Sequence, residues 1–236
     1  MSRDRAELCR ETRHCRGHLL DCYGLRTARS ERATTPEEAG AIAARIGPAV
    51  ALKALGLDIV HKTEIGGVTL GLTGSGATAD AARSMAERVG EAGATLDGFL
   101  VQEMVDEGVE MLVGVAHDPV FGPVVACSPG GTSVELVHDV AVRVTPITDL
   151  DASEMVRSLR TFPLLDGFRH ARKADVPALE EVILRVSALV ENHPSIAEMD
   201  CNPVMILPHG AVIVDARVRV QEVSPPRPLA ARATAE

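Results

Sequence analysis

The sequence predicts an α+β fold organised as two lobes. In the first half of the chain, helix-like and strand-like segments alternate, whereas the second half consists mainly of strands joined by short turns, with two helices among them. A chain of 236 residues is long enough to bury a substantial core. A ligand cleft between lobes is a common outcome of such an organisation.

The small lobe is predicted over residues 26–97, after an N-terminal helix at residues 8–22. Its clearest signal is the start of a helix. Thr35 suits the N-cap, Pro36 suits the first helical position, and two acids occupy the first turn. The apolar pattern predicts that this helix continues to residue 46 and is followed by strands at 49–54 and 67–72 and a helix at 78–93.

The large lobe is predicted over residues 98–222, and residues 223–236 are expected to form a disordered tail because they lack core residues. Asp151 is expected to cap a helix, and Pro203 is expected to end a strand or to place it at a sheet edge. The other predicted elements are strands at 98–105, 110–116, 123–126, 140–144, 196–202 and 211–220, a turn at 128–131, and helices at 151–159 and 175–191.

The composition argues against several functional classes. Aromatic residues make up only 2% of the chain, which disfavours surfaces that stack nucleic-acid bases. The net charge of −9 disfavours nonspecific binding to nucleic acid or anionic membranes, and no apolar run is long enough to span a bilayer. The five cysteines include no CxxC pair, and the N-terminus lacks an apolar signal sequence. We therefore expect a cytoplasmic protein that binds neither nucleic acid nor membrane.

A polar segment, Asp58–Val68, joins two strand-like runs and contains His61, Lys62, Glu64 and two adjacent glycines. It is too long for a tight hairpin turn, and the glycines allow the backbone to approach an anion closely. Lys53 lies inside the preceding apolar strand, where its charge needs a partner. A bound phosphate and an internal carboxylate are both candidates for that partner.

A second polar group lies near the C-terminus. Glu198, Asp200 and Asn202 are spaced by two, so on a strand they project from one face. Asp215 lies among apolar residues in the next predicted strand, and a hairpin would bring it to the same face. Two carboxylates and an amide oxygen suit Mg²⁺, with nucleotide phosphates completing the coordination shell. The alternative is a surface row of acids balanced by the nearby arginines, Arg217 and Arg219.

These features occur in one order along residues 15–222. The order is Lys53 in Val-Ala-Leu-Lys, Asp58–Val68, Gln102–Met104, Glu110, Asp118–Pro123, Gly130-Gly131 followed by Glu135, and Glu198-x-Asp-x-Asn-Pro203 with Asp215. In this combination the chain resembles the ATP-grasp subunit of NDP-forming acyl-CoA synthetases. This is the ADP-forming acetate–CoA ligase type, which is related to the succinyl-CoA synthetase β chain.

The resemblance implies an ATP-grasp domain over residues 1–222, with the nucleotide between the two lobes. It also implies a role for each matching residue. Lys53 contacts phosphate, Gln102, Glu103 and Met104 meet adenine, Glu110 binds near the ribose, Asp200, Asn202 and Asp215 hold Mg²⁺, and His61 on a mobile loop relays a phosphoryl group. Phosphoryl transfer depends on positioning and charge neutralisation, and neutral imidazole is a competent phosphoryl carrier.

The implied activity is that of an acid–CoA ligase (ADP-forming), which uses ATP/ADP and Mg²⁺. The chain has no Gly-x-Gly-x-x-Gly fingerprint of a CoA-binding Rossmann-like domain. The resemblance therefore implies a partner, a CoA-binding α subunit or domain that binds most of the acyl acid and CoA, in a heterotetramer of two α and two β chains.

Two other functions stay open at this point. One is an ATP-grasp ligase that joins a carboxylate to an amine and does not need His61. The other is a noncatalytic, nucleotide-binding regulatory subunit. The latter is favoured by Ser128-Pro129, which stands where the family has a glycine-rich entry, because proline removes a backbone N–H there.

Overall fold

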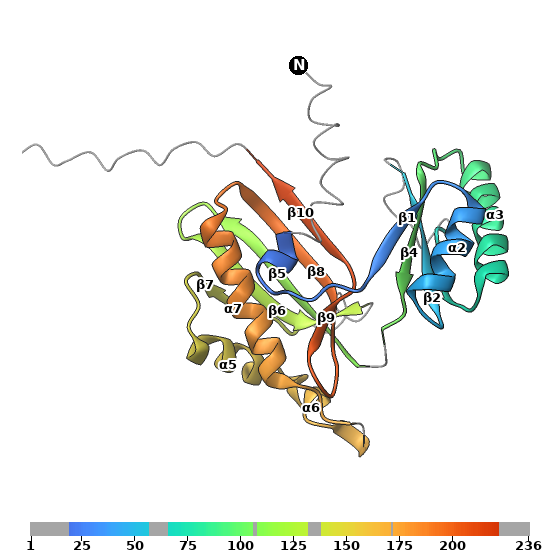
Figure 1. Ribbon diagram of the computed structural model, residues 1–236. Coiled ribbons are helices and arrows are strands. Elements are labelled where there is room, and N and C mark those ends of the chain that lie inside the picture. Colours follow the sequence, from blue (N-terminus) through green and yellow to red (C-terminus); the bar gives the residue numbers. More distant parts are fainter. Residues whose placement is uncertain (1–18, 57–65, 106–107, 132–137, 171, 222–236) are drawn as a thin grey trace, which may run out of the picture. The chain divides into compact units, whose positions relative to one another are not determined.

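The computed structural model describes residues 19–56, 66–105, 108–131, 138–170 and 172–221 (Figure 1). The chain divides into two compact units. The smaller unit comprises Arg26–Gly108 together with Val212–Val214, and the larger unit comprises Met1–Leu25, Val109–Ala211 and Asp215–Glu236. Residues 19–22, at the end of the predicted N-terminal helix, are helical, and the rest of that helix and the tail at 223–236 lie outside the described residues.

The smaller unit is a four-stranded antiparallel sheet in the order β1-β4-β2-β3 with two helices packed against it. Its core consists of apolar residues from the sheet and both helices, among them Ile42, Leu52, Met85 and Phe99. The elements are β1 (Ser30–Ala33), α2 (Pro36–Ile46), β2 (Val50–Leu55), β3 (Val68–Leu72), α3 (Ser75–Glu91) and β4 (Gly98–Glu103).

Two local features of the smaller unit bear on the predictions. The Thr35 hydroxyl accepts a hydrogen bond from Glu38 N at 3.2 Å, so the predicted N-cap of α2 is confirmed. Residues 98–103 were predicted to belong to the large lobe, whereas the structure places them, as β4, between β1 and β2 of the smaller unit. The reason is pairing, since β4 forms antiparallel ladders with both neighbours.

The larger unit is built on an antiparallel sheet in the order β10-β8-β5-β6-β7. Helix α7 packs across β5, β6 and β8, and α5 packs against α7 and β7 (Figure 1). The elements are β5 (Val109–Asp118), β6 (Gly122–Pro129), β7 (Ala141–Val144), α5 (Asp149–Ser158), α6 (Phe162–Leu165), a 3-10 turn (Phe168–His170), α7 (Val176–Asn192), β8 (Ile196–Ile206) and β10 (Ala216–Val220). Of β9 (Ala211–Ile213), only Ala211 belongs to the larger unit.

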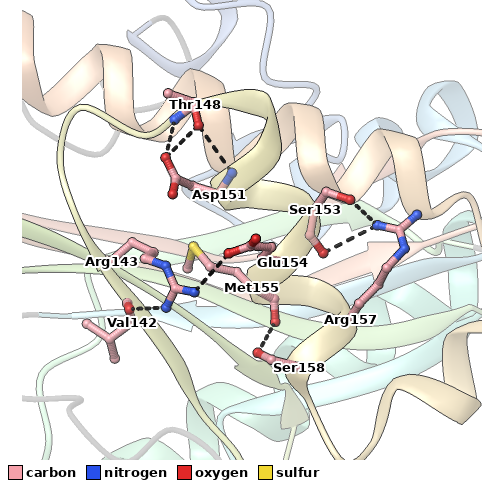
Figure 2. A network of polar contacts seen from close by, with 9 residues as sticks. All are labelled: Val142, Arg143, Thr148, Asp151, Ser153, Glu154, Met155, Arg157 and Ser158. Atoms are coloured by element: carbon pink, nitrogen blue, oxygen red, sulfur yellow. Dashed lines mark hydrogen bonds and ion pairs between the residues drawn. The ribbon is translucent and has the colours of Figure 1, made fainter.

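The prediction that Asp151 caps a helix was wrong in its position. Thr148 is the N-cap of α5, and Asp151 is the third helical residue of a capping box (Figure 2). The Asp151 Oδ2 atom accepts from Thr148 N at 2.9 Å, and Thr148 Oγ1 accepts from Asp151 N at 3.2 Å. Both residues favour helix starts, and the reciprocal pair places the N-cap three residues earlier than predicted.

The predictions for Pro203 and for the turn at 128–131 were also wrong. Strand β8 continues through Pro203 and lies between β10 and β5. Met111 of β5 pairs with Val204 and Val113 pairs with Cys201, so the register shifts at this proline. A bulge accommodates proline inside a sheet because the bulged residue donates no ladder hydrogen bond. Ser128 and Pro129 are the last residues of β6 rather than part of a turn.

The last predicted strand, 211–220, is two strands, β9 and β10, with Val214 and Asp215 between them. Asp215 therefore lies at a break and not within a strand. In the described part of the chain, no helix is both long and apolar enough to cross a membrane.

Candidate functional site

Strand β8 presents a polar face and a buried face. Met199 and Cys201 are buried, whereas Glu198 is exposed and Asp200 and Asn202 are partly exposed. This alternation follows from the two-residue period of a strand. The three polar residues thus share one face of the larger unit's sheet, as the spacing predicted.

Glu198 belongs to a surface ion pair. Its cross-strand partner on β10 is Arg219, and Arg219 Nη2 lies 2.6 Å from Glu198 Oε1. The hydrogen bond and the charge of Arg219 lower the pKa of Glu198. The alternative of a balanced surface acid therefore holds for Glu198.

Asp200 is in a different environment. Its side chain is half-buried, and its Oδ1 atom is buried without a hydrogen-bond partner among the described residues. Burial raises the pKa of Asp200, the charge of Arg217 opposes this, and the charge of Asp215 adds to it. A half-buried carboxylate with an unpartnered oxygen and a like charge nearby is costly unless a cation joins it.

The break between β9 and β10 brings Asp215 to Asn202. The backbone N–H of Asn202 donates to Asp215 O at 3.0 Å, and Asp215 Oδ1 accepts from Ala216 N at 3.0 Å. The next pair along the ladder is Ala216 with Cys201, followed by Arg217 with Asp200. Register thus places all three predicted metal-ligand residues at one end of the β8–β10 ladder.

A glycine corner adjoins this group. Gly130 N donates to Glu110 O at 2.8 Å, and Gly131 N donates to the side-chain oxygen of Asn202 at 3.2 Å. Gly131 has φ +68°, a left-handed conformation that favours glycine, and a Cβ there would displace the flexible end of the Glu110 side chain. The corner links Glu110 of β5 to Asn202 of β8. Nothing in the spacing of these residues signals that link, since it depends on the β5–β8 pairing.

The donor set fits a hard divalent cation. Carboxylate oxygens of Asp200 and Asp215 and the amide oxygen of Asn202 are ligands of the kind that Mg²⁺ accepts, and this ion usually keeps waters and phosphate oxygens as its other ligands. Among the described residues, no group of three or more His, Cys, Asp or Glu could hold a metal by itself.

The predicted residues of the smaller unit are placed as follows. Lys53 lies in β2, opposite Val68 and Leu100. Gln102 is buried, its Nε2 donates to Val214 O at 2.9 Å, and its Oε1 is buried without a hydrogen-bond partner in the described ranges. Glu103 Oε1 accepts from Arg29 N at 2.9 Å, and the Met104 side chain is 40% exposed.

Three predicted features lie outside the described residues. They are His61 with the rest of residues 57–65, Glu135, and the tail. Their predicted roles are not tested by the structure.

The chain is similar to known proteins along most of its length. A family model described as an ATP-grasp domain matches residues 6–220. The acetate–CoA ligase (ADP-forming) I of Archaeoglobus fulgidus is 38% identical over 209 residues, which cover 86% of this chain and 30% of that protein. The β subunit of the acetate–CoA ligase (ADP-forming) I of Pyrococcus furiosus is 35% identical over 202 residues, which cover 85% of this chain and 87% of that subunit. The chain thus spans less than a third of the first protein and most of the second.

Solved structures of one synthetase also match. The dinucleotide-forming acetyl-coenzyme A synthetase 1 of Ca. Korarchaeum cryptofilum, in complex with coenzyme A, Ca-AMPCP and HgCl⁺, has a TM-score of 0.85 at 34% identity. That match covers 94% of this chain and 100% of the other. A second structure, with coenzyme A and Mg-AMPPCP and its phosphohistidine segment pointing towards the nucleotide-binding site, has a TM-score of 0.76 at 34% identity and covers 86% of this chain and 88% of the other.

Proposed function

Because this chain belongs to the ATP-grasp family and is a relative of the β subunits of ADP-forming acetate–CoA ligases, we propose that it is the nucleotide-binding subunit of an ADP-forming acyl-CoA ligase. The reaction is acyl-CoA + ADP + Pi ⇌ acid + CoA + ATP. The observation that carries the proposal is the pair Asp200 and Asp215, in which a buried carboxylate oxygen lacks a partner among the described residues.

The candidate site residues of the larger unit each have a role in this proposal. Asp200, Asp215 and Asn202 hold Mg²⁺, and Glu110 binds the ribose. A bound Mg²⁺ would neutralise charge on the phosphate oxygens. The Gly131 N–H holds the Asn202 amide in one orientation through their hydrogen bond, so the amide oxygen faces a fixed direction. The like charges of Asp200 and Asp215 favour cation binding.

In the smaller unit, Lys53 binds phosphate, and Gln102, Glu103 and Met104 line the adenine site. Support for Gln102 comes from its fixed orientation. Its Nε2 is committed to Val214 O, so its unpartnered Oε1 is available to accept a hydrogen bond from a ligand. His61 carries the phosphoryl group, because neutral imidazole can accept it and release it again.

A partner supplies the rest of the enzyme. The match covers 30% of the A. fulgidus ligase and 87% of a P. furiosus chain described as a β subunit. We infer a CoA-binding α subunit or domain that binds CoA and most of the acyl acid, assembled with this chain as a heterotetramer. This arrangement assigns acid specificity to the partner.

Calorimetric titration of the purified chain with Mg-ATP tests the nucleotide site. We expect binding by the wild type, a large loss of affinity in Lys53→Met because a phosphate contact is removed, and a loss of about tenfold or more in Asp215→Asn because a metal ligand is weakened. Matched controls are Lys173→Met, which removes an exposed lysine paired with Asp166, and Glu198→Gln, which removes the carboxylate paired with Arg219.

The controls should bind Mg-ATP like the wild type. Unchanged affinity in Asp215→Asn would remove Asp215 from the metal site, and unchanged affinity in Lys53→Met would remove Lys53 from the phosphate site. If the wild type does not bind, the titration is repeated with the partner present. Absence of binding in that complex would overturn the proposal.

The variant His61→Ala separates the proposed ligase from the other functions. We expect it to bind Mg-ATP normally and to lose turnover with the partner, because the phosphoryl carrier is gone. Full turnover would favour an ATP-grasp ligase that joins a carboxylate to an amine. If the wild-type complex shows no phosphoryl transfer while still binding nucleotide, the chain is a regulatory subunit.

A further inference from the structure

The β8–β10 ladder carries two successive pairs of opposite charge. Arg219 lies opposite Glu198, and Arg217 lies opposite Asp200. Directly opposite residues of an antiparallel pair point to the same face of the sheet. The two arginines therefore lie on the face that carries the proposed metal ligands.

These two pairs differ in one respect. Arg219 and Glu198 form a close ion pair at 2.6 Å, with both side chains more than half exposed. Within the described ranges, Arg217 forms no ion pair of that kind, although its charge still lowers the pKa of Asp200. The pair Arg219 and Glu198 is thus a closed ion pair, whereas among the described residues the pair beside the proposed metal site, Arg217 and Asp200, is not.

On the other side of Asp200, the neighbouring strands contribute small residues. On β5 the residue opposite Asp200 is Gly114, and on β6 the residue opposite Gly114 is Ala126. A Cβ at Gly114 would meet its nearest atoms, Leu112 Cδ2 and Met199 O, at 3.4 Å, which is ordinary van der Waals contact, so no close backbone approach requires the glycine. The two residues that continue the row of Asp200 across β5 and β6, Gly114 and Ala126, therefore have little or no side chain.

We propose that Arg217 binds the phosphate tail of the nucleotide, beside the cation held by Asp200 and Asp215. The inference rests on the proposed function and extends it to a residue that the sequence had offered only as a surface counter-charge. A Mg-nucleotide presents both signs of charge, a cation for the carboxylates and phosphate oxygens for a guanidinium. The planar guanidinium offers paired donors that match phosphate oxygens, and Arg217 is not committed to a described carboxylate.

The test compares Arg217→Gln with the matched control Arg219→Gln, using calorimetry of the full chain, or of its complex with the partner, with Mg-ATP and with AMP. We expect Arg217→Gln to weaken Mg-ATP binding by about ten- to a hundredfold, the loss of a charge-assisted contact, while AMP affinity changes less than about twofold. Arg217→Lys should recover part of the loss because the charge is retained. Arg219→Gln should match the wild type for both ligands.

Each outcome decides the matter. Unchanged Mg-ATP affinity in Arg217→Gln overturns the assignment of Arg217 and leaves the proposed function intact. An equal loss for Mg-ATP and AMP also overturns it, because that pattern indicates a structural role for Arg217. Absence of Mg-ATP binding in the wild-type complex overturns the proposed function and this inference together.

Discussion

At the residue scale, Asp139 is a buried carboxylate with a structural task. It accepts hydrogen bonds from Arg160 N at 3.0 Å, Thr161 N at 2.8 Å and Thr161 Oγ1 at 2.6 Å, next to the start of α6. Burial raises the pKa of Asp139, but these hydrogen bonds and the charge of Arg160 lower it by more. The carboxylate therefore ties the segment before β7 to the helical layer.

Replacing Asp139 by Asn should destabilise the fold by about 1–3 kcal/mol at pH 7, since a buried charged acceptor is lost. Urea unfolding of both proteins measures the difference. The control Asp166→Asn removes an exposed carboxylate paired with Lys173 and should change stability by less than about 0.5 kcal/mol.

The Asp139→Asn variant also tests how the contribution of Asp139 to folding stability depends on pH. The pKa of folded Asp139 is depressed, so its contribution is complete above the unfolded value of about 4 and is lost as the pH falls through the folded value. The gap between wild type and Asp139→Asn should be constant from pH 7 to about 5 and narrow below about 4. A gap that widens in acid would contradict the assignment.

The acids of β8 show what the sequence could not resolve at this scale. Their spacing predicted a shared face correctly, but it left open whether they were metal ligands or balanced surface acids. The structure gives Glu198 a close arginine and leaves Asp200 half-buried with an unpartnered oxygen among the described residues. Both acids have an arginine directly opposite on β10, so the difference lies in burial and side-chain pairing, which no spacing along β8 encodes.

At the scale of elements, the Gly130-Gly131 corner closes the end of β6 against β5. A Cβ on Gly130 would lie 2.7 Å from the backbone carbonyl of Met111, and backbone cannot move aside as a flexible side chain can. Gly130→Ala should therefore destabilise the protein by about 1–3 kcal/mol and weaken Mg-ATP binding, because Glu110 and Asn202 share this corner.

Thermal unfolding and calorimetry measure both effects. Gly90→Ala in α3 is the matched control, since a Cβ there meets nothing within 4 Å and alanine favours a helix. It should leave binding unchanged and keep or slightly raise the unfolding temperature. Equal behaviour of the two variants would show that the corner tolerates a side chain.

The elements themselves were largely predictable, and two of the errors share a cause. Helix starts at Thr35 and Asp175 were correct because the capping signal is local. The course of β8 through Pro203 and the break before β10 were missed because both depend on neighbouring strands. Local rules for proline describe isolated strands, whereas a bulge in a paired sheet removes the penalty.

At the scale of the whole molecule, the predicted α+β, ATP-grasp class is confirmed by the family model and by the solved structures. The sequence also indicated the family correctly, because its motifs are informative in combination. It could not place the boundary between the two units, since the chain that forms the smaller unit is not continuous.

That discontinuity has a consequence for dissecting the protein. Val212–Val214 belong to the smaller unit, where Ala28 N donates to Ile213 O at 2.9 Å and Gln102 Nε2 donates to Val214 O. A fragment of residues 26–108 expressed alone lacks Val212–Val214, which come from the distant end of the chain. Both donors would therefore lose their protein acceptors. We therefore expect this fragment to need a second segment of the chain, and a synthetic peptide that contains Val212–Val214 would supply the missing acceptors.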